Sequence, residues 1–297
     1  MLVLTAAQLD EYDRVGAVTV DAGLTRAELA RAEAAFDRLC AFNDLGVPAG
    51  QYSPDHRYRV GGGGTAYTQP LLDVLQHPNL EQAAKQVLRA GDVHFFQTAA
   101  TASYPEPLSA AGKNGTRPHF HIDTQMSLAD FEATPRRTVG MMWLWLTDVT
   151  PTRAPLMFHP GSHRTIAATW GAQLRPLLPR VQGIAAQDSL LSHLVPDLQP
   201  ATPVLAKAGQ MTILTTGVLH SASPNHDPSG VRKVFLTTFT AAGVTMGGPP
   251  NQLEAKVTFD SWLLPRLRPE RRHLIPTAKG TETDAAKAAV GSWPSKL

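Results

Sequence analysis

The spacing of apolar residues changes near residue 92, and this change limits the folds that the chain can adopt. Before it, apolar residues recur at helical spacing. After it, short apolar or alternating runs are separated by Pro, Gly, Asn and Asp, as is typical of many short strands. Seven or eight strands after a helical start predict a mainly β protein with flanking helices and a double-stranded β-helix core, the cupin-like jelly roll, because paired sheets leave few exposed edges. We expect strands near residues 92–101, 118–125, 138–147, 155–159, 203–206, 211–216 and 231–240.

The residues before this change carry signals for the start of helices. Two pairs fit a capping box, in which one side chain caps a backbone amide of the helix and the other reaches back: Thr5 with Gln8, and Thr25 with Glu28. After the second pair, the apolar spacing predicts a helix over residues 26–41 that covers the core. Asn79 and Gly91 bound a third expected helix, near residues 80–90.

No internal repeat or long linker divides the chain, so we expect one domain over residues 1–297. In this division residues 1–91 are mainly helical and residues 92–245 form the jelly-roll core. Residues 246–297 cover the core with a short helix and irregular chain.

Composition narrows the kinds of partner. The 297 residues are 43% apolar and 18% charged, as in an ordinary globular protein. The net charge of +2 comes from interleaved charges, so we expect a small-molecule substrate and neither nucleic acid nor membrane as partner. The amino terminus lacks a positive leader region and no apolar run approaches the roughly 20 residues of a membrane span, which predicts a cytoplasmic protein. The carboxy-terminal segment could pack across a homodimer.

Any metal site must use histidine and carboxylate ligands, because Cys40 is the only cysteine and excludes a thiolate cluster. Residues 117–125 read Arg-Pro-His-Phe-His-Ile-Asp-Thr-Gln and suggest a strand in this region. On a strand, His121 and Asp123 point to the same face about 6.6 Å apart, close enough to converge on one ion. His119 lies about 13 Å from Asp123 along that strand, so we place it at the rim.

A third ligand and a cation follow in a later segment. His220 lies in the run Leu-His-Ser-Ala-Ser-Pro-Asn, and Arg232 opens the next expected strand. Two imidazoles and one carboxylate occupy one face of an octahedron and leave three positions open, which is typical of Fe(II) oxygenases. Two open positions suit 2-oxoglutarate and the third suits dioxygen. Arg232 can bind the far carboxylate of 2-oxoglutarate, since arginine is a planar and permanently charged donor.

With these residues, nearly the whole chain resembles the phytanoyl-CoA dioxygenase family, a branch of the Fe(II)/2-oxoglutarate dioxygenases. Residues 4–39 look like its helix, strand, helix start, and Pro-Leu-Met-Phe-His-Pro-Gly-Ser-His at residues 155–163 looks like its characteristic PGSH loop. Arg153-Ala154 stands where the family often has Asn-Gly, and Ala222 stands where it often has Ser. The spacing from the second ligand histidine to the arginine is one residue longer than in several relatives.

The resemblance implies Fe(II) as cofactor, 2-oxoglutarate and O2 as co-substrates, and hydroxylation of a small molecule with release of succinate and CO2. Asp123 argues against halogenation, because halogenating relatives carry a small residue there that leaves room for chloride. No catalytic residue is expected beyond the metal centre. By position, the family's iron ligands fall on His121, Asp123 and His220, its 2-oxoglutarate arginine falls on Arg232, and Gln97 and Trp143 line the co-substrate pocket.

Other residues near the expected site have weaker signals. Trp143 and Trp145 share one face of a strand and also fit core aromatics. His159 and His163 lie in a tight Pro-Gly turn, where a histidine is more often a hydrogen-bonding loop residue than a metal ligand. Four residues that flank the metal pair or lie at strand ends are candidates for substrate contact: Arg117, His119, Gln125 and Tyr104.

Two other functions stay open on the sequence alone. Zinc or manganese in the same ligands would suit a hydrolase or isomerase, which absence of 2-oxoglutarate turnover would favour. A catalytically silent ligand-binding protein is the second, because a fold does not guarantee chemistry. The substrate is open, as is the choice among hydroxylation, desaturation, ring closure and epimerisation.

Overall fold

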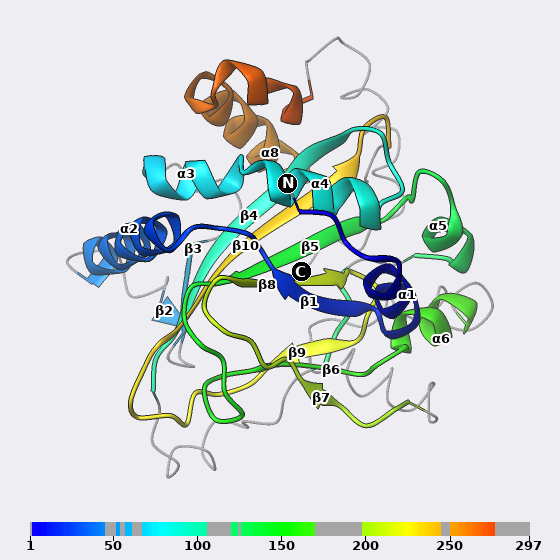
Figure 1. The fold of residues 1–297 in the computed structure, drawn as a ribbon, viewed down its shortest axis with the longest axis horizontal. Coiled ribbons are helices and arrows are strands. Elements are labelled where there is room, and N and C mark those ends of the chain that lie inside the picture. Colours follow the sequence, from blue (N-terminus) through cyan, green and yellow to red (C-terminus); the bar gives the residue numbers. More distant parts are fainter. Residues whose placement is uncertain are drawn as a thin grey trace.

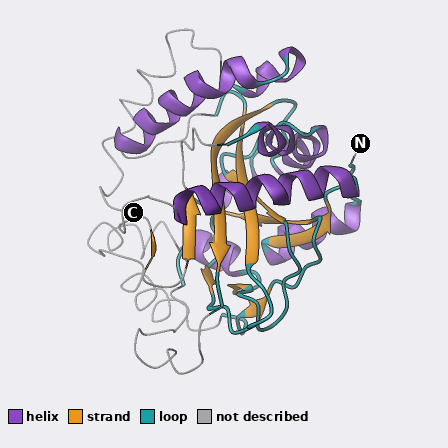
Figure 2. Cartoon of the chain, turned by 90° about the vertical axis from the view of Figure 1, so that its left-hand side faces the viewer, coloured by secondary structure: helices purple, strands orange, loops and turns teal. Residues whose placement is uncertain are grey.

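Two antiparallel sheets face each other, and helices cover the outer side of the larger one (Figure 1). Figure 2 shows the same arrangement from the side, with helices layered against the strands. None of the helices within the described part of the chain is long and apolar enough to cross a membrane. The computed structural model describes residues 2–44, 52–53, 57–60, 67–105, 120–123, 126–169, 198–244 and 250–276.

The large sheet has seven strands, each antiparallel to its neighbours. The small sheet has three antiparallel strands. In spatial order the large sheet is β1 (Ala17–Asp21), β8 (Gln210–Thr215), β5 (Val139–Trp145), β10 (Arg232–Ala241), β4 (Val93–Ser103), β3 (Arg57–Val60) and β2 (Tyr52–Ser53). The small sheet is β7 (Thr202–Pro203), β6 (Leu156–Phe158) and β9 (His220–Ala222).

The helices come mainly before and after the strands of the core (Figure 1). They are α1 (Ala6–Val15), α2 (Arg26–Asp44), α3 (Gln69–Leu75), α4 (Pro78–Val87), α5 (Leu128–Glu132), α6 (Ser162–Thr169) and α8 (Pro250–Leu263), followed by the 3-10 turns η5 (Leu264–Arg266) and η6 (Pro269–Leu274).

The apolar core has two layers, because successive side chains of a strand point to opposite faces of its sheet. On β10, Phe235 and Phe239 pack into the cluster between the large sheet and the helices. Val234 and Leu236, which alternate with them, pack into a second cluster between the two sheets. The second layer places the inward residues of β4, β5 and β10 around the interior of the jelly roll.

Both predicted capping boxes form, and α2 confirms the helix predicted over residues 26–41. The helix predicted near residues 80–90 is present as α4, but it begins earlier, at Pro78. His77 rather than Asn79 is its N-cap, since a proline suits the first turn of a helix. The helix ends before residue 90, because Arg89 adopts a φ of 51°, which breaks the helical repeat.

Five predicted strands are present as β4, β5, β6, β8 and β10, and β1 is the strand that the family resemblance implied between the first two helices. The prediction of a strand over residues 118–125 is wrong for the described residues 120–123. Only His121 forms a β-bridge there, because the Asp123 amide donates to the Thr216 carbonyl 3.0 Å away and the chain bends. The strand predicted over residues 203–206 is divided, because Pro203 belongs to β7, which pairs with β6, whereas Ala206 forms an isolated bridge with Val149.

Candidate metal centre

His121 and His220 lie directly opposite each other on neighbouring segments. The amide of each donates to the carbonyl of the other at 2.9 Å, and their ring centroids are 4.5 Å apart. His220 is the first residue of β9. On the side away from His121, it pairs with Phe158 of β6. Cross-strand partners project their side chains to the same face, so the two imidazoles are brought together by backbone pairing.

Asp123 completes the group through the bend that follows His121. One carboxylate oxygen lies 3.5 Å from Nε2 of His121, and the other lies 3.4 Å from Nε2 of His220. One ligand atom from each of the three residues lies within 4.8 Å of the others. Bonds of about 2.1 Å at right angles would place ligand atoms about 3 Å apart. The distances from Asp123 to the two imidazoles are close to this value, and the wider separations, of up to 4.8 Å, would shorten around a single ion.

His220 is prepared as a ligand by its surroundings. Its side chain is buried, and Nδ1 lies 2.9 Å from the carbonyl oxygen of Val218. A carbonyl can only accept, so Nδ1 carries the hydrogen and Nε2 is left for a metal. Burial lowers the pKa of His220, while the charge of Asp123 raises it. A neutral imidazole is the form that ligates metals.

The PGSH loop holds His220 from behind. The amide of His159 donates to the Leu219 carbonyl at 2.9 Å, and the Leu219 amide donates to Oγ of Ser162 at 2.8 Å. Ser162 is fully buried and begins α6. The loop therefore binds both the amide and the carbonyl of Leu219, the residue before His220. The sequence of the motif alone did not reveal this role.

Neither histidine of that loop joins the metal group. Nδ1 of His159 lies 2.7 Å from the Gln199 carbonyl, and its ring packs against Phe120. Nε2 of His163 lies 3.1 Å from the Asp13 carbonyl, and burial lowers the pKa of His163 to about 4. Both side chains bind backbone carbonyl groups instead.

Arg232 is the first residue of β10 and is buried, with 1% of its surface exposed. Its Nη2 donates at 2.7 Å to Oγ of Ser103, the residue that pairs with Arg232 on the neighbouring strand β4. Its guanidinium carbon lies 5.8 Å from the ring centroid of Trp145. Arg232 lies on the same face of β10 as Val234 and Leu236, so it belongs to the interior between the sheets. A guanidinium stays charged when buried, which makes this position suited to an anionic ligand.

Trp143 and Gln97 lie on neighbouring strands. Trp143 stacks on Trp145 with centroids 6.1 Å apart and packs against the cluster between the sheets. Its Nε1 is buried and has no hydrogen-bond partner among the described residues. The backbone of Gln97 exchanges hydrogen bonds of 2.9 and 3.0 Å with Oγ1 of Thr238, its partner on β10.

The candidates for substrate contact are less well placed by the structure. Tyr104 is partly buried at the end of β4, where it packs against the cluster on the helix side of the large sheet. This position gives no support to contact with a substrate between the sheets. Arg117, His119 and Gln125 lie outside the described residues.

The chemistry of the donor set fits a divalent iron ion. His121 and His220 offer imidazole nitrogens, Asp123 offers a carboxylate oxygen, and such a set on one face leaves three coordination positions open. Nitrogen and oxygen donors suit iron, whereas no thiolate takes part.

Comparisons with known proteins agree with this geometry. The sequence profile described as phytanoyl-CoA dioxygenase (PhyH) matches residues 12–234. An ectoine dioxygenase of Nocardia farcinica (strain IFM 10152) is 25% identical over 235 residues, covering 77% of this chain and 76% of that protein.

Two solved structures show the same fold and confirm the predicted double-stranded β-helix. The non-heme alpha ketoglutarate dependent carbocyclase SnoK from nogalamycin biosynthesis has a TM-score of 0.59 at 19% identity, covering 80% of this chain and 85% of SnoK. EctD from S. alaskensis, solved with 2-oxoglutarate and 5-hydroxyectoine, has a TM-score of 0.55 at 17% identity, covering 82% of this chain and 78% of EctD.

Proposed function

Because the chain belongs to the phytanoyl-CoA dioxygenase family, we propose that it is an Fe(II)- and 2-oxoglutarate-dependent dioxygenase that hydroxylates a small molecule and releases succinate and CO2. The proposal rests on the meeting of two segments, in which His121 and Asp123 from one and His220 of β9 from the other bring their ligand atoms within 4.8 Å of one another. We propose the iron ligands and the residues of the co-substrate pocket from the positions of these side chains in the structure of this chain.

In this proposal the chain's residues position the reactants. His121, Asp123 and His220 hold Fe(II), which together with 2-oxoglutarate and O2 supplies the oxidising chemistry. Asp123 gives the site one negative charge, and the two neutral imidazoles add none. No side chain needs to act as an acid or base, so the protein contributes orientation and exclusion of water.

Arg232 binds the far carboxylate of 2-oxoglutarate. Its burial strengthens the interaction, because charges attract more strongly away from water. Ser103 accepts a hydrogen bond from Nη2 of Arg232. This bond limits the orientations that the planar guanidinium can adopt. Trp143 and Gln97 line the co-substrate, and the buried Nε1 of Trp143 supplies a hydrogen-bond donor there.

The test is formation of succinate from 2-oxoglutarate with Fe(II), O2 and a panel of small molecules. Ectoine belongs in the panel because it is in the name of a relative. Wild type should form succinate, and His121→Ala and Asp123→Ala should form none because they cannot hold iron. Activity in either variant at normal iron content would reject the ligand assignment, and no succinate from iron-loaded wild type would favour another metalloenzyme reaction.

Several further statements from the sequence stay predictions. These are contact of Arg117, His119 and Gln125 with substrate, the single domain over residues 1–297, a homodimer, and a cytoplasmic location.

A further inference from the structure

Residues 223–231 connect β9 to β10 and therefore join two residues of the proposed site. His220 begins β9, and Arg232 begins β10. A co-substrate that binds iron at one end and Arg232 at the other must match the distance between these two strands. The geometry of the connecting loop, here called the ligand-to-anchor loop, therefore bears directly on co-substrate binding.

Asn225 holds this loop from inside. Its side chain is fully buried, and its amide nitrogen donates to the carbonyls of Ser103 at 2.9 Å and Gly230 at 2.8 Å. Its side-chain oxygen accepts from the amide of Asp227 at 3.0 Å. Asn225 thus ties the end of β4 to both halves of the ligand-to-anchor loop.

Ser103 carries this contact to Arg232. The Ser103 carbonyl accepts from Asn225, and the Ser103 hydroxyl accepts from Nη2 of Arg232 at 2.7 Å. Ser103 and Arg232 are also partners across β4 and β10. Two hydrogen bonds therefore separate the Asn225 amide from the guanidinium, and both are buried where water does not compete.

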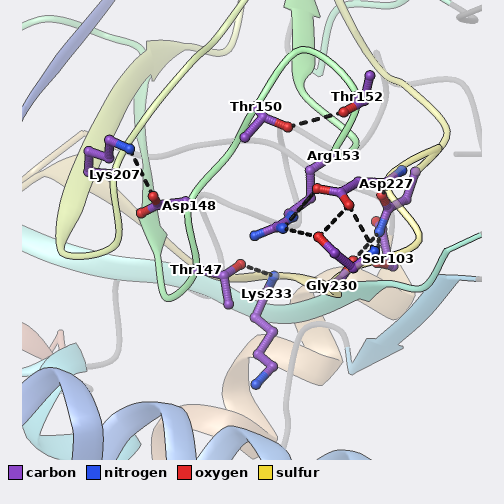
Figure 3. Close-up of polar contacts among 12 residues, drawn as sticks. Ser103, Thr147, Asp148, Thr150, Thr152, Arg153, Lys207, Asp227, Gly230 and Lys233 are labelled. Carbon is purple, nitrogen blue, oxygen red and sulfur yellow. Dashed lines mark hydrogen bonds and ion pairs between the residues drawn. The ribbon is translucent and has the colours of Figure 1, made fainter.

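Arg153 holds the same loop from outside (Figure 3). Its guanidinium bonds the Asp227 carboxylate, with Nε and Nη2 at 2.9 and 2.8 Å, and Nη2 donates to Oγ of Ser229 at 3.0 Å. It also packs on Gly230, where an added Cβ would lie 3.0 Å from the Arg153 guanidinium carbon. The backbone of Arg153 forms a bridge with Asn225.

We propose that Asn225 is a positioning residue for Arg232, and that the Arg153–Asp227 ion pair keeps the ligand-to-anchor loop in the shape that Asn225 requires. In this proposal neither Asn225 nor the Arg153–Asp227 ion pair contacts the co-substrate. Their effect is to set where the guanidinium lies relative to the iron ligands. The inference rests on the proposed function, since it takes Arg232 as the anchor for 2-oxoglutarate.

The experiment measures the Kd of 2-oxoglutarate for the Mn(II)-loaded protein by anaerobic calorimetry, alongside the Kd of Mn(II) alone. Asn225→Ala should raise the Kd of 2-oxoglutarate about tenfold, as loss of a supporting hydrogen bond does at other sites. The Kd of Mn(II) should stay within about twofold, because His220 is held by β6 and by His121. Arg153→Ala, a partly exposed change, should raise the Kd of 2-oxoglutarate about threefold, and Arg153→Lys should recover part of it.

Lys207→Ala is the matched control. It removes the exposed Lys207–Asp148 ion pair, which lies apart from the ligand-to-anchor loop in the same view (Figure 3). This variant should leave both Kd values at those of wild type. If Asn225→Ala does not fold, the Arg153 pair of variants decides the matter through the same two Kd values.

A double-mutant cycle separates positioning from general damage. In an Arg232→Ala background, Asn225→Ala should cause no further loss of 2-oxoglutarate affinity. An equal further loss, or an unchanged Kd in the single variants, overturns the inference while the anchor stands. If Arg232→Ala itself leaves the Kd of 2-oxoglutarate unchanged, the anchor in the proposed function is wrong, and the inference goes with it.

Discussion

At the scale of single residues, the candidate site depends on which atoms each side chain leaves for a ligand. The Val218 carbonyl accepts a hydrogen bond from Nδ1 of His220, and Nε2 faces Asp123. Burial, which lowers the pKa of His220, keeps the ring neutral near pH 7. Arg232 is the opposite case, a buried group that keeps its charge, held in place by Ser103.

Arg232→Lys tests the importance of the planar guanidinium. A lysine keeps the positive charge but loses the paired donors and the flat face that lies over Trp145. We expect the KM for 2-oxoglutarate to rise about tenfold with a smaller change in kcat, because loss of paired donors weakens ground-state binding. Initial rates of succinate formation against 2-oxoglutarate concentration give both values. An unchanged KM would move the anchor to another residue.

At the scale of elements, local signals were sufficient where the chain makes local contacts. The capping boxes of α1 and α2 formed as predicted, since each uses residues three positions apart. The three residues that the sequence grouped as metal ligands also lie together in the fold, and the His-x-Asp spacing of two of them is a local signal. The bend at Asp123 could not be predicted, because it depends on the Thr216 carbonyl, which lies far along the chain. Local pattern does not encode such partners.

Gly16, which ends α1, also has a neighbour that the local sequence does not predict. Its φ is 89°, and an added Cβ would lie 2.6 Å from Nδ1 of His163, a residue that only the fold brings near. Gly16→Ala should lower the free energy of unfolding by about 2 kcal/mol, since it adds strain at a left-handed position and a clash. Gly91→Ala is the control, because an added Cβ there meets nothing within 4 Å. Urea denaturation compares them, and equal stability of the two variants would contradict the account.

At the scale of the whole molecule, the two-sheet architecture followed from the spacing of strand signals, but the pairing of strands did not. β1 pairs with β8, whose residues lie some 190 positions later in the sequence. Packing of the two core layers decides such pairing. η6 is likewise joined to α4 by contacts between residues far apart in the sequence, with Glu81 bonded to Arg271 and His273.

The Glu81 contacts predict how stability depends on pH. Burial raises the pKa of Glu81, but hydrogen bonds from Lys85 and His273 and the charge of Arg271 outweigh it and lower the pKa to about 2. A carboxylate whose pKa falls on folding stabilises the protein above its unfolded pKa of about 4.3, and this contribution is lost as the pH falls towards 2.

Glu81→Gln should therefore lower the free energy of unfolding at pH 7 by about 2 kcal/mol, less than the full pKa shift would give because water screens the partly exposed partners. The difference from wild type should shrink as the pH falls from 5 to 2. Denaturation at a series of pH values measures it, and a difference independent of pH would contradict the assignment.

We propose that His121, Asp123 and His220 bind Fe(II) while Arg232 binds 2-oxoglutarate at the same centre. Anaerobic addition of Fe(II) and 2-oxoglutarate to the purified protein tests it through the weak visible charge-transfer band of the iron chelate. We predict a band in wild type only with both additions, no band in Asp123→Ala, and a weakened band in Arg232→Ala at equal 2-oxoglutarate. A wild-type protein that binds the metal but gives no band would contradict the claim.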